Sequence, residues 1–178
     1  MDGFLGEWLN LLLRWSHMIA GIAWIGTSFY FVALDFSLKK PNGLPAGVGG
    51  EAWEVHGGGF YHVQKYLSAP ARMPDHLTWF RWEAYLTWVT GFILLVAQYY
   101  FQAPAYLIDP AVLPLASWQA IAISIVSIIA GWVIYDSLCR SPISRNTSLL
   151  AACVLVLILA FAYVFTQVFS GRGAFIHV

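Results

Sequence analysis

Residues 149–169, LLAACVLVLILAFAYVFTQVF, decide the fold of this chain. The stretch carries no charged residue, and it is as long as the roughly 20 apolar residues that a helix needs to cross a bilayer. Backbone polar groups inside lipid must bond within their own segment, so an isolated apolar run of this length is helical. The stretch therefore predicts a transmembrane helix.

Three further apolar segments lie at residues 8–36, 79–101 and 115–138. The whole sequence is 60% hydrophobic and only 10% charged, whereas a soluble domain carries about a quarter charged residues. We therefore predict an all-α integral membrane helix bundle. It forms one membrane domain over residues 1–178, with about four transmembrane helices.

The basic residues between these segments predict the orientation in the membrane. They fall in the first and third connections, namely Lys39, Lys40, Lys65, Arg72, Arg140 and Arg145. The second connection has none, and the N-terminal end carries Asp2 and Glu7. By the positive-inside rule, the N-terminus lies outside and the first and third connections are cytoplasmic.

The remaining composition narrows the function. The formal net charge is zero, which gives no support for a nucleic-acid partner. The two cysteines form no C-x-x-C or C-x-x-C-H motif. Residues 174–178 resemble the start of another apolar segment, so we expect the chain to be the N-terminal portion of a longer protein.

Polar residues form a stripe along the first segment, at Arg14, His17, Gly21, Trp24, Ser28 and Asp35. Their spacing of three, four and seven places them on one helix face. A charged side chain at mid-bilayer costs about 2.5–3.5 kcal/mol even on the translocon scale. The stripe is therefore expected to face other helices or a wet cavity.

Two interpretations of this stripe stay open. In the structural one, Arg14 reaches the outer interface, Asp35 sits at the cytoplasmic end and His17 bonds a neighbouring helix. In the other, Arg14 and His17 belong to a cofactor site, because a neutral imidazole ligates haem iron. His177 lies at a similar predicted depth, so the second interpretation includes a haem b held by both histidines.

The long first connection predicts a β-hairpin over about residues 51–67, around three consecutive glycines. With Gly57–Gly59 as the loop, Val55 faces Tyr61 and Glu54 faces His62. Glu51 then faces Lys65. Both charge pairings favour this register.

This register predicts one apolar face and one polar face. We expect the polar face to hold the candidate catalytic residues, namely Glu54, His56, His62 and Gln64, since histidine near its ordinary pKa suits proton transfer. Two alternatives remain: a hairpin that only caps the bundle, and a zinc site built from Glu54, His56, His62 and His76.

Three strings carry a family resemblance: RWSHMIAGIAWIGTSFYF at residues 14–31, EAWEVHGGGFYH at 51–62 and TWFRWEAY at 78–85. They resemble the bacterial membrane-bound urate oxidases, also called urate hydroxylases. The resemblance covers essentially the whole chain, and it implies a multi-pass protein of the bacterial inner membrane with a C-terminal cytochrome c domain.

The resemblance also implies a reaction: oxidation of urate to 5-hydroxyisourate in purine breakdown, with electrons passed to cytochrome c. Because the chain lacks C-x-x-C-H, the implied haem c belongs to a further domain or a soluble partner. We therefore expect this portion alone to be inactive. Two other functions stay open: a non-catalytic haem-b electron-transfer subunit and a purine transporter.

Overall fold

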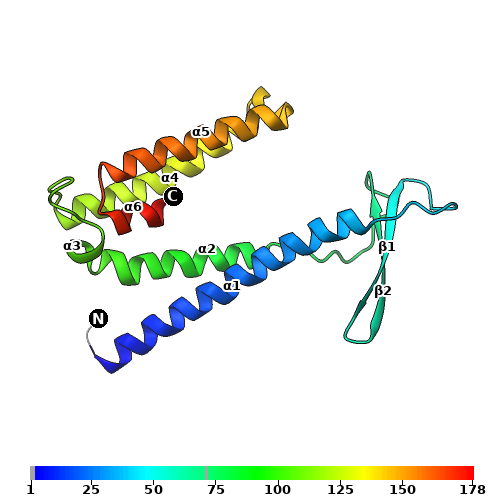
Figure 1. Ribbon diagram of the computed structural model, residues 1–178, viewed down its shortest axis with the longest axis horizontal. Helices are drawn as coiled ribbons and strands as arrows, with labels where there is room; N and C mark the ends of the chain where they lie inside the picture. The colour runs from blue at the N-terminus through cyan, green and yellow to red at the C-terminus, as the bar shows by residue number, and fades with distance from the viewer. Residues whose placement is uncertain (1–2, 71) are drawn as a thin grey trace. The chain divides into compact units, whose positions relative to one another are not determined.

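The computed structural model describes residues 3–70 and 72–178 (Figure 1). Asp2, which entered the orientation argument, lies outside the described residues. The elements in chain order are α1 (Phe4–Ser37), β1 (Val48–His56), β2 (Gly59–Tyr66), α2 (Trp82–Leu95), η1 (Val96–Tyr100), α3 (Ala103–Tyr106), α4 (Ser117–Arg140), η2 (Pro142–Arg145), α5 (Thr147–Thr166) and α6 (Gly171–His177).

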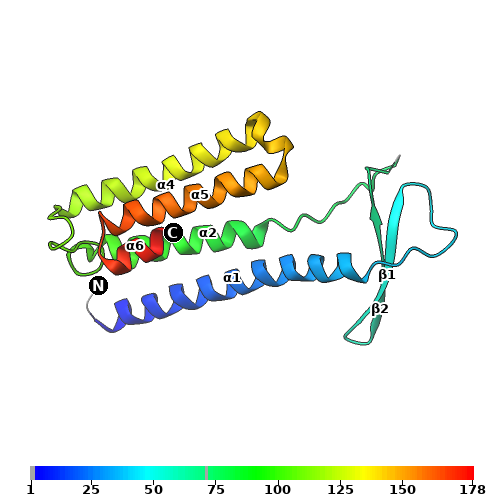
Figure 2. The same ribbon diagram turned by 45° about the horizontal axis from the view of Figure 1, so that its top comes forward.

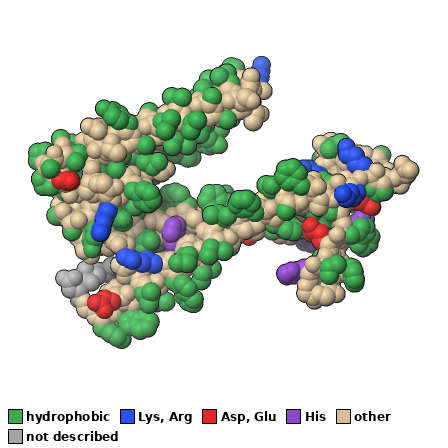
Figure 3. Space-filling view, viewed as in Figure 1, with side chains coloured by type: hydrophobic (Ala, Val, Ile, Leu, Met, Phe, Trp, Pro, Cys, Tyr) green, Lys and Arg blue, Asp and Glu red, His purple; other side chains and the backbone are tan. Residues whose placement is uncertain are grey.

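Three helices of the described chain, α1, α4 and α5, are long and apolar enough to cross a membrane. At most 11% of the most apolar window of each is buried inside the protein, and many hydrophobic side chains lie on the visible helix surfaces (Figure 3). Outward-facing apolar side chains on helices of this length suggest a membrane protein.

The expected count of four spans is not confirmed. The second apolar segment is helical, but α2 has 14 residues, or about 21 Å at 1.5 Å per residue. It then changes to the π-helix η1 and ends in a turn at Phe101. The second segment therefore does not form one regular membrane-spanning helix, because its α-helical part is interrupted and is shorter than the roughly 30 Å hydrocarbon layer.

The chain divides into two compact units, residues 14–90 and the remainder. In the second of these, α4 and α5 lie side by side in both views and are joined through η2 (Figures 1 and 2). A small core closes one end of this helix pair, formed by Ala103, Leu107, Ala120, Phe165, Phe169 and Ala174. Gly173 is required there, because a Cβ would lie 3.0 Å from the Phe169 Cβ and 3.1 Å from the Leu107 carbonyl.

The other unit contains the predicted hairpin, with β1 and β2 antiparallel. Its loop has two residues, Gly57 and Gly58, with φ of +58° and +80°. Positive φ at both central positions is the requirement of a type I′ turn, whose twist matches that of the strands. Gly59 therefore belongs to β2 and pairs with His56.

The predicted three-residue loop is wrong, and the register changes by one residue as a result. The observed pairs include Val55 with Phe60, Trp53 with His62, and Glu51 with Gln64. Since side chains alternate across a strand, a shift by one on β2 exchanges its two faces relative to β1. Glu54 and His56 consequently lie on the opposite face from His62 and Gln64.

The turn makes a stability prediction. Gly58→Val forces a β-branched residue into positive φ, at a cost of about 1–2 kcal/mol. We expect the backbone amides of β1 and β2 to exchange with solvent about 5–30 times faster, measured by hydrogen exchange. Gly57→Asn is the control, because Asn tolerates this conformation, and its exchange is expected to stay near that of the wild type. Equal exchange in both variants would contradict the turn assignment.

Candidate functional site

One face of the hairpin gathers a carboxylate, an imidazole and an amide. His62 Nε2 lies 2.8 Å from Glu51 Oε2, and Gln64 Nε2 donates to the same oxygen at 3.2 Å. The hydrogen bonds from Gln64 and His62 lower the pKa of the Glu51 carboxyl. Glu51 is therefore an anion at neutral pH, with two neighbouring donors on one oxygen.

An aromatic ring completes this face. The rings of Trp53 and His62 are stacked, with centroids 4.3 Å apart and planes 13° apart. Trp53 is 68% exposed, and the His62 side chain is 34% exposed. The face therefore presents a flat apolar ring beside groups that exchange protons and form hydrogen bonds. We call Glu51, Trp53, His62 and Gln64 the hairpin cluster.

The backbone of Glu51 is held on both sides. It pairs with Gln64 across the hairpin, and it exchanges two hydrogen bonds with Lys39, of 2.8 and 2.9 Å. The neighbouring Gly50 permits this approach, since a Cβ there would lie 3.1 Å from Leu38 Cβ and 3.2 Å from the Lys39 carbonyl. The carboxylate therefore projects from a backbone fixed by three strand segments.

The opposite face attaches the hairpin to the C-terminal part of α1. Tyr30 donates a 2.6 Å hydrogen bond to Glu54, and Lys65 Nζ lies 2.6 Å from both oxygens of Asp35. Figure 3 shows the acidic and basic side chains that gather around the hairpin. Glu54 is thus engaged in attachment, and His56 is exposed beside the turn. The four predicted catalytic residues are therefore divided between two faces.

The stripe on α1 has a defined contact with α2. The Thr90 hydroxyl donates to the Leu86 carbonyl at 2.6 Å, so it accepts from His17 Nδ1 at 3.1 Å. This is the contact with a neighbouring helix that the structural interpretation expected. In the neutral ring this contact places the proton on Nδ1 and leaves a lone pair on Nε2. Arg14 is exposed.

His177 lies in the other unit, within a buried chain of hydrogen bonds. Its Nδ1 donates to the Gly173 carbonyl at 2.6 Å, so Nε2 of the neutral ring accepts from Ser124. The fully buried Ser124 hydroxyl in turn accepts from Tyr100 at 2.7 Å. Both ring nitrogens of His177 are therefore engaged, so in this arrangement the residue does not fit an axial haem ligand.

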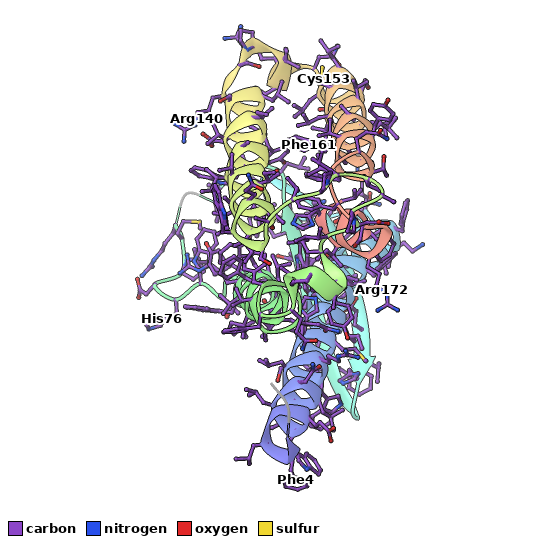
Figure 4. The ribbon with its side chains drawn as sticks, turned by 90° about the vertical axis from the view of Figure 1, so that its left-hand side faces the viewer. Phe4, His76, Arg140, Cys153, Phe161 and Arg172 are labelled. Carbon is purple, nitrogen blue, oxygen red and sulfur yellow. The ribbon has the colours of Figure 1, made fainter. Side chains whose placement is uncertain are left out.

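A cleft of about 400 Å³ lies between α4 and α5, and His177 is one of its lining residues. Phe161 lies between the two helices in Figure 4. The small residues Ser127 and Gly131 line the α4 side of this cleft.

A zinc site of several protein ligands finds no support in the described part of the chain. Among residues 3–70 and 72–178, no group of three or more His, Cys, Asp or Glu side chains is placed to hold a metal ion. The zinc alternative fails on the register, because Glu54 and His56 lie across the sheet from His62.

Glu51 and Trp53 are partners of His62 that the sequence-based prediction does not include. The predicted register pairs Glu51 with Lys65 and does not include Trp53 among the residues of the polar face. The available signal was the Gly-Gly pair, since two-residue loops are the commonest hairpin connections. A two-residue loop at Gly57 and Gly58 directly gives the observed pairs.

The lowered pKa of Glu51 sets a pH dependence. A carboxyl whose pKa is lower in the folded state stabilises folding above its unfolded pKa, and this contribution is lost as the pH falls through the folded value. We expect the Tm of the solubilised protein to decrease as the pH is lowered from about 7 to about 3, and we expect this decrease to be smaller in Glu51→Gln. Identical acid profiles for the two proteins would contradict the Glu51 contacts.

The buried hydroxyl makes a second prediction. Ser124→Ala leaves Tyr100 and His177 without their shared partner, at a cost of about 1–3 kcal/mol. Ser137→Ala is the matched control on the same helix, since the exposed Ser137 hydroxyl donates to the Val133 carbonyl of its own helix. We expect the Tm in detergent to fall clearly for Ser124→Ala and little for Ser137→Ala. Equal decreases in Tm would contradict the buried hydrogen-bond chain.

The sequence model of a family described as "Urate oxidase N-terminal" matches residues 3–178. No curated protein and no solved structure matches the chain.

Proposed function

The chain belongs to the Urate oxidase N-terminal family, and from this we propose that it takes part in membrane-bound oxidation of urate to 5-hydroxyisourate, with electrons passed to a cytochrome c. Family membership suggests a urate-related role by itself. The observation that carries the finer proposal is the hairpin cluster, which combines a stacking ring, an amide, an imidazole and a carboxylate on one exposed face.

The chemistry of the reaction explains why these groups suit it. Urate plus water gives 5-hydroxyisourate with release of two electrons and two protons. A planar purine is recognised by stacking and by hydrogen bonds along its edge, which Trp53 and Gln64 supply. A proton acceptor is also needed, and His62 serves this role with Glu51 beside it. The electrons leave to the cytochrome c.

An anionic substrate that approaches the anionic Glu51 is repelled unless the carboxylate is screened. After proton transfer, the imidazolium of His62 faces Glu51, which stabilises its positive charge. In the ground state both Glu51 contacts are donors directed at the carboxylate, which reduces its repulsion of an approaching anion.

His17 is the residue that fits a haem b, if the protein carries one. Its Nδ1 is held by Thr90 and its Nε2 keeps a lone pair, which is the arrangement of a metal-ligating histidine with a supporting hydrogen bond. Such a haem would supply one-electron transfer. This geometry favours the alternative of a haem-b electron-transfer subunit, for which a haem absorbance band in wild-type membranes and its loss in His17→Ala is the test.

The first test of the proposed function uses membranes that carry the full-length protein. Urate is added, and its ultraviolet absorbance is followed together with the reduced-cytochrome bands. We expect urate to disappear as the cytochrome is reduced. Intact haem bands with no loss of urate would contradict the oxidase and favour the electron-carrier alternative.

The hairpin cluster makes a further prediction in the same assay. His62→Ala is expected to lower the rate of urate-dependent cytochrome reduction by about 10²–10⁴-fold, the usual contribution of a general base. His76→Ala is the control, because His76 is an exposed histidine of the following connection. Full activity in His62→Ala would remove His62 from the mechanism.

A further inference from the structure

Glu51 is the centre of the hairpin cluster, and its contacts suggest a role beyond stabilising the charge of the His62 imidazolium. Its carboxylate is the shared acceptor of His62 and Gln64, and its backbone is fixed by Lys39 and Gln64. The Glu51 side chain is only 20% exposed. A group held this firmly can orient its neighbours without touching the substrate.

The hydrogen-bond inventory determines which nitrogen of His62 carries the proton. An ionised carboxylate accepts hydrogen bonds and cannot donate. His62 Nε2 faces Glu51 Oε2 at 2.8 Å, so Nε2 is the protonated nitrogen. In the neutral ring the lone pair then resides on Nδ1, which is the only remaining basic atom of the imidazole.

The same argument orients Gln64. Its amide nitrogen donates to Glu51 Oε2 at 3.2 Å, which places the amide nitrogen, and not the carbonyl oxygen, against the carboxylate. The Gln64 carbonyl is thereby left as an acceptor for an N–H group. The stack on Trp53 fixes the plane of the His62 ring. The orientations of His62 Nδ1 and of the Gln64 carbonyl oxygen are therefore both determined.

We propose that Glu51 is a positioning residue that orients His62 and Gln64, so that His62 Nδ1 is the atom that accepts a proton from urate. This inference rests on the proposed function for the identity of the substrate. In the step, a ring N–H bond of urate breaks and an Nδ1–H bond forms. The electron pair of the broken bond stays on urate. Two electrons then pass from urate to cytochrome c haem one at a time, water adds its hydroxyl group at C5, and the second proton leaves to solvent. The imidazolium faces the Glu51 carboxylate, which stabilises its charge.

The experiment compares Glu51→Leu and Glu51→Gln with the wild type in the full-length protein. Glu51→Leu removes the acceptor at similar size, whereas Glu51→Gln keeps an acceptor oxygen and removes the charge. The control is Asp75→Asn, which removes an exposed carboxylate from the following connection. Hydrogen exchange of the β1 and β2 amides establishes that the hairpin is folded in each variant.

The first readout does not depend on urate. In the wild type labelled with ¹⁵N-histidine, we expect a His62 Nε2–H proton signal that is protected from exchange and is identified by its absence in His62→Asn. The signal disappears in Glu51→Leu and persists in Asp75→Asn. A signal unchanged in Glu51→Leu overturns the inference, whatever the result with urate.

The second readout is the kinetics of urate oxidation. Loss of orientation lowers kcat by about 10–100-fold with little change in KM, because ring alignment matters most in the transition state. Glu51→Gln is expected to retain part of kcat. Wild-type kcat in Glu51→Leu, with the Nε2–H signal lost, also overturns the inference. If the wild-type protein does not oxidise urate, the proposed function is contradicted, and so is the role of Glu51 in that reaction. The Nε2–H signal still decides the orientation of His62 in that case.

Discussion

The two-residue turn at Gly57 and Gly58 is the constraint on which the candidate site depends. Both residues have positive φ, a conformation that costs side-chain-bearing residues about 1–2 kcal/mol and costs glycine little. The turn fixes the strand register, and the register decides which side chains share a face. With one more residue in the loop, His62 would lie on the face of Glu54, and Glu51 would lose its contact with the imidazole.

The two faces of the hairpin then acquire different tasks. One face is attached to α1 by Tyr30 with Glu54 and by Asp35 with Lys65. These pairs are exposed, and such pairs contribute about 0–1 kcal/mol each. The backbone hydrogen bonds between Glu51 and Lys39, which follows α1, add to this attachment. The other face remains open, and it carries the groups that the proposed chemistry needs.

The helices could be predicted from the sequence, and the details of the site could not. Continuous apolar runs have few structural solutions in lipid, so all four segments were correctly expected to be helical. The second run failed as a regular span because hydropathy does not reveal the π-helix at Val96–Tyr100. The hairpin was correctly placed, but its register depended on one residue of loop length. Charge pairing of Glu51 with Lys65 was a weaker signal than turn geometry.

In both units, polar side chains within the helices form hydrogen bonds with side chains of neighbouring helices. His17 bonds Thr90, and Ser124 joins Tyr100 to His177, so these side chains are satisfied by neighbouring helices. Periodicity could place His17 on an inward stripe, but it could not identify a partner 73 residues away. Contacts of this kind arise from tertiary packing, which no local pattern contains.

The central claim is that the hairpin cluster is where urate binds. The most direct measurement is a cryo-electron microscopy map of the full-length protein in the presence of urate. The account predicts density for a planar ring beside Trp53, within hydrogen-bonding distance of His62 and Gln64. Density for the ring beside His17 on α1, with the hairpin cluster empty, would contradict it.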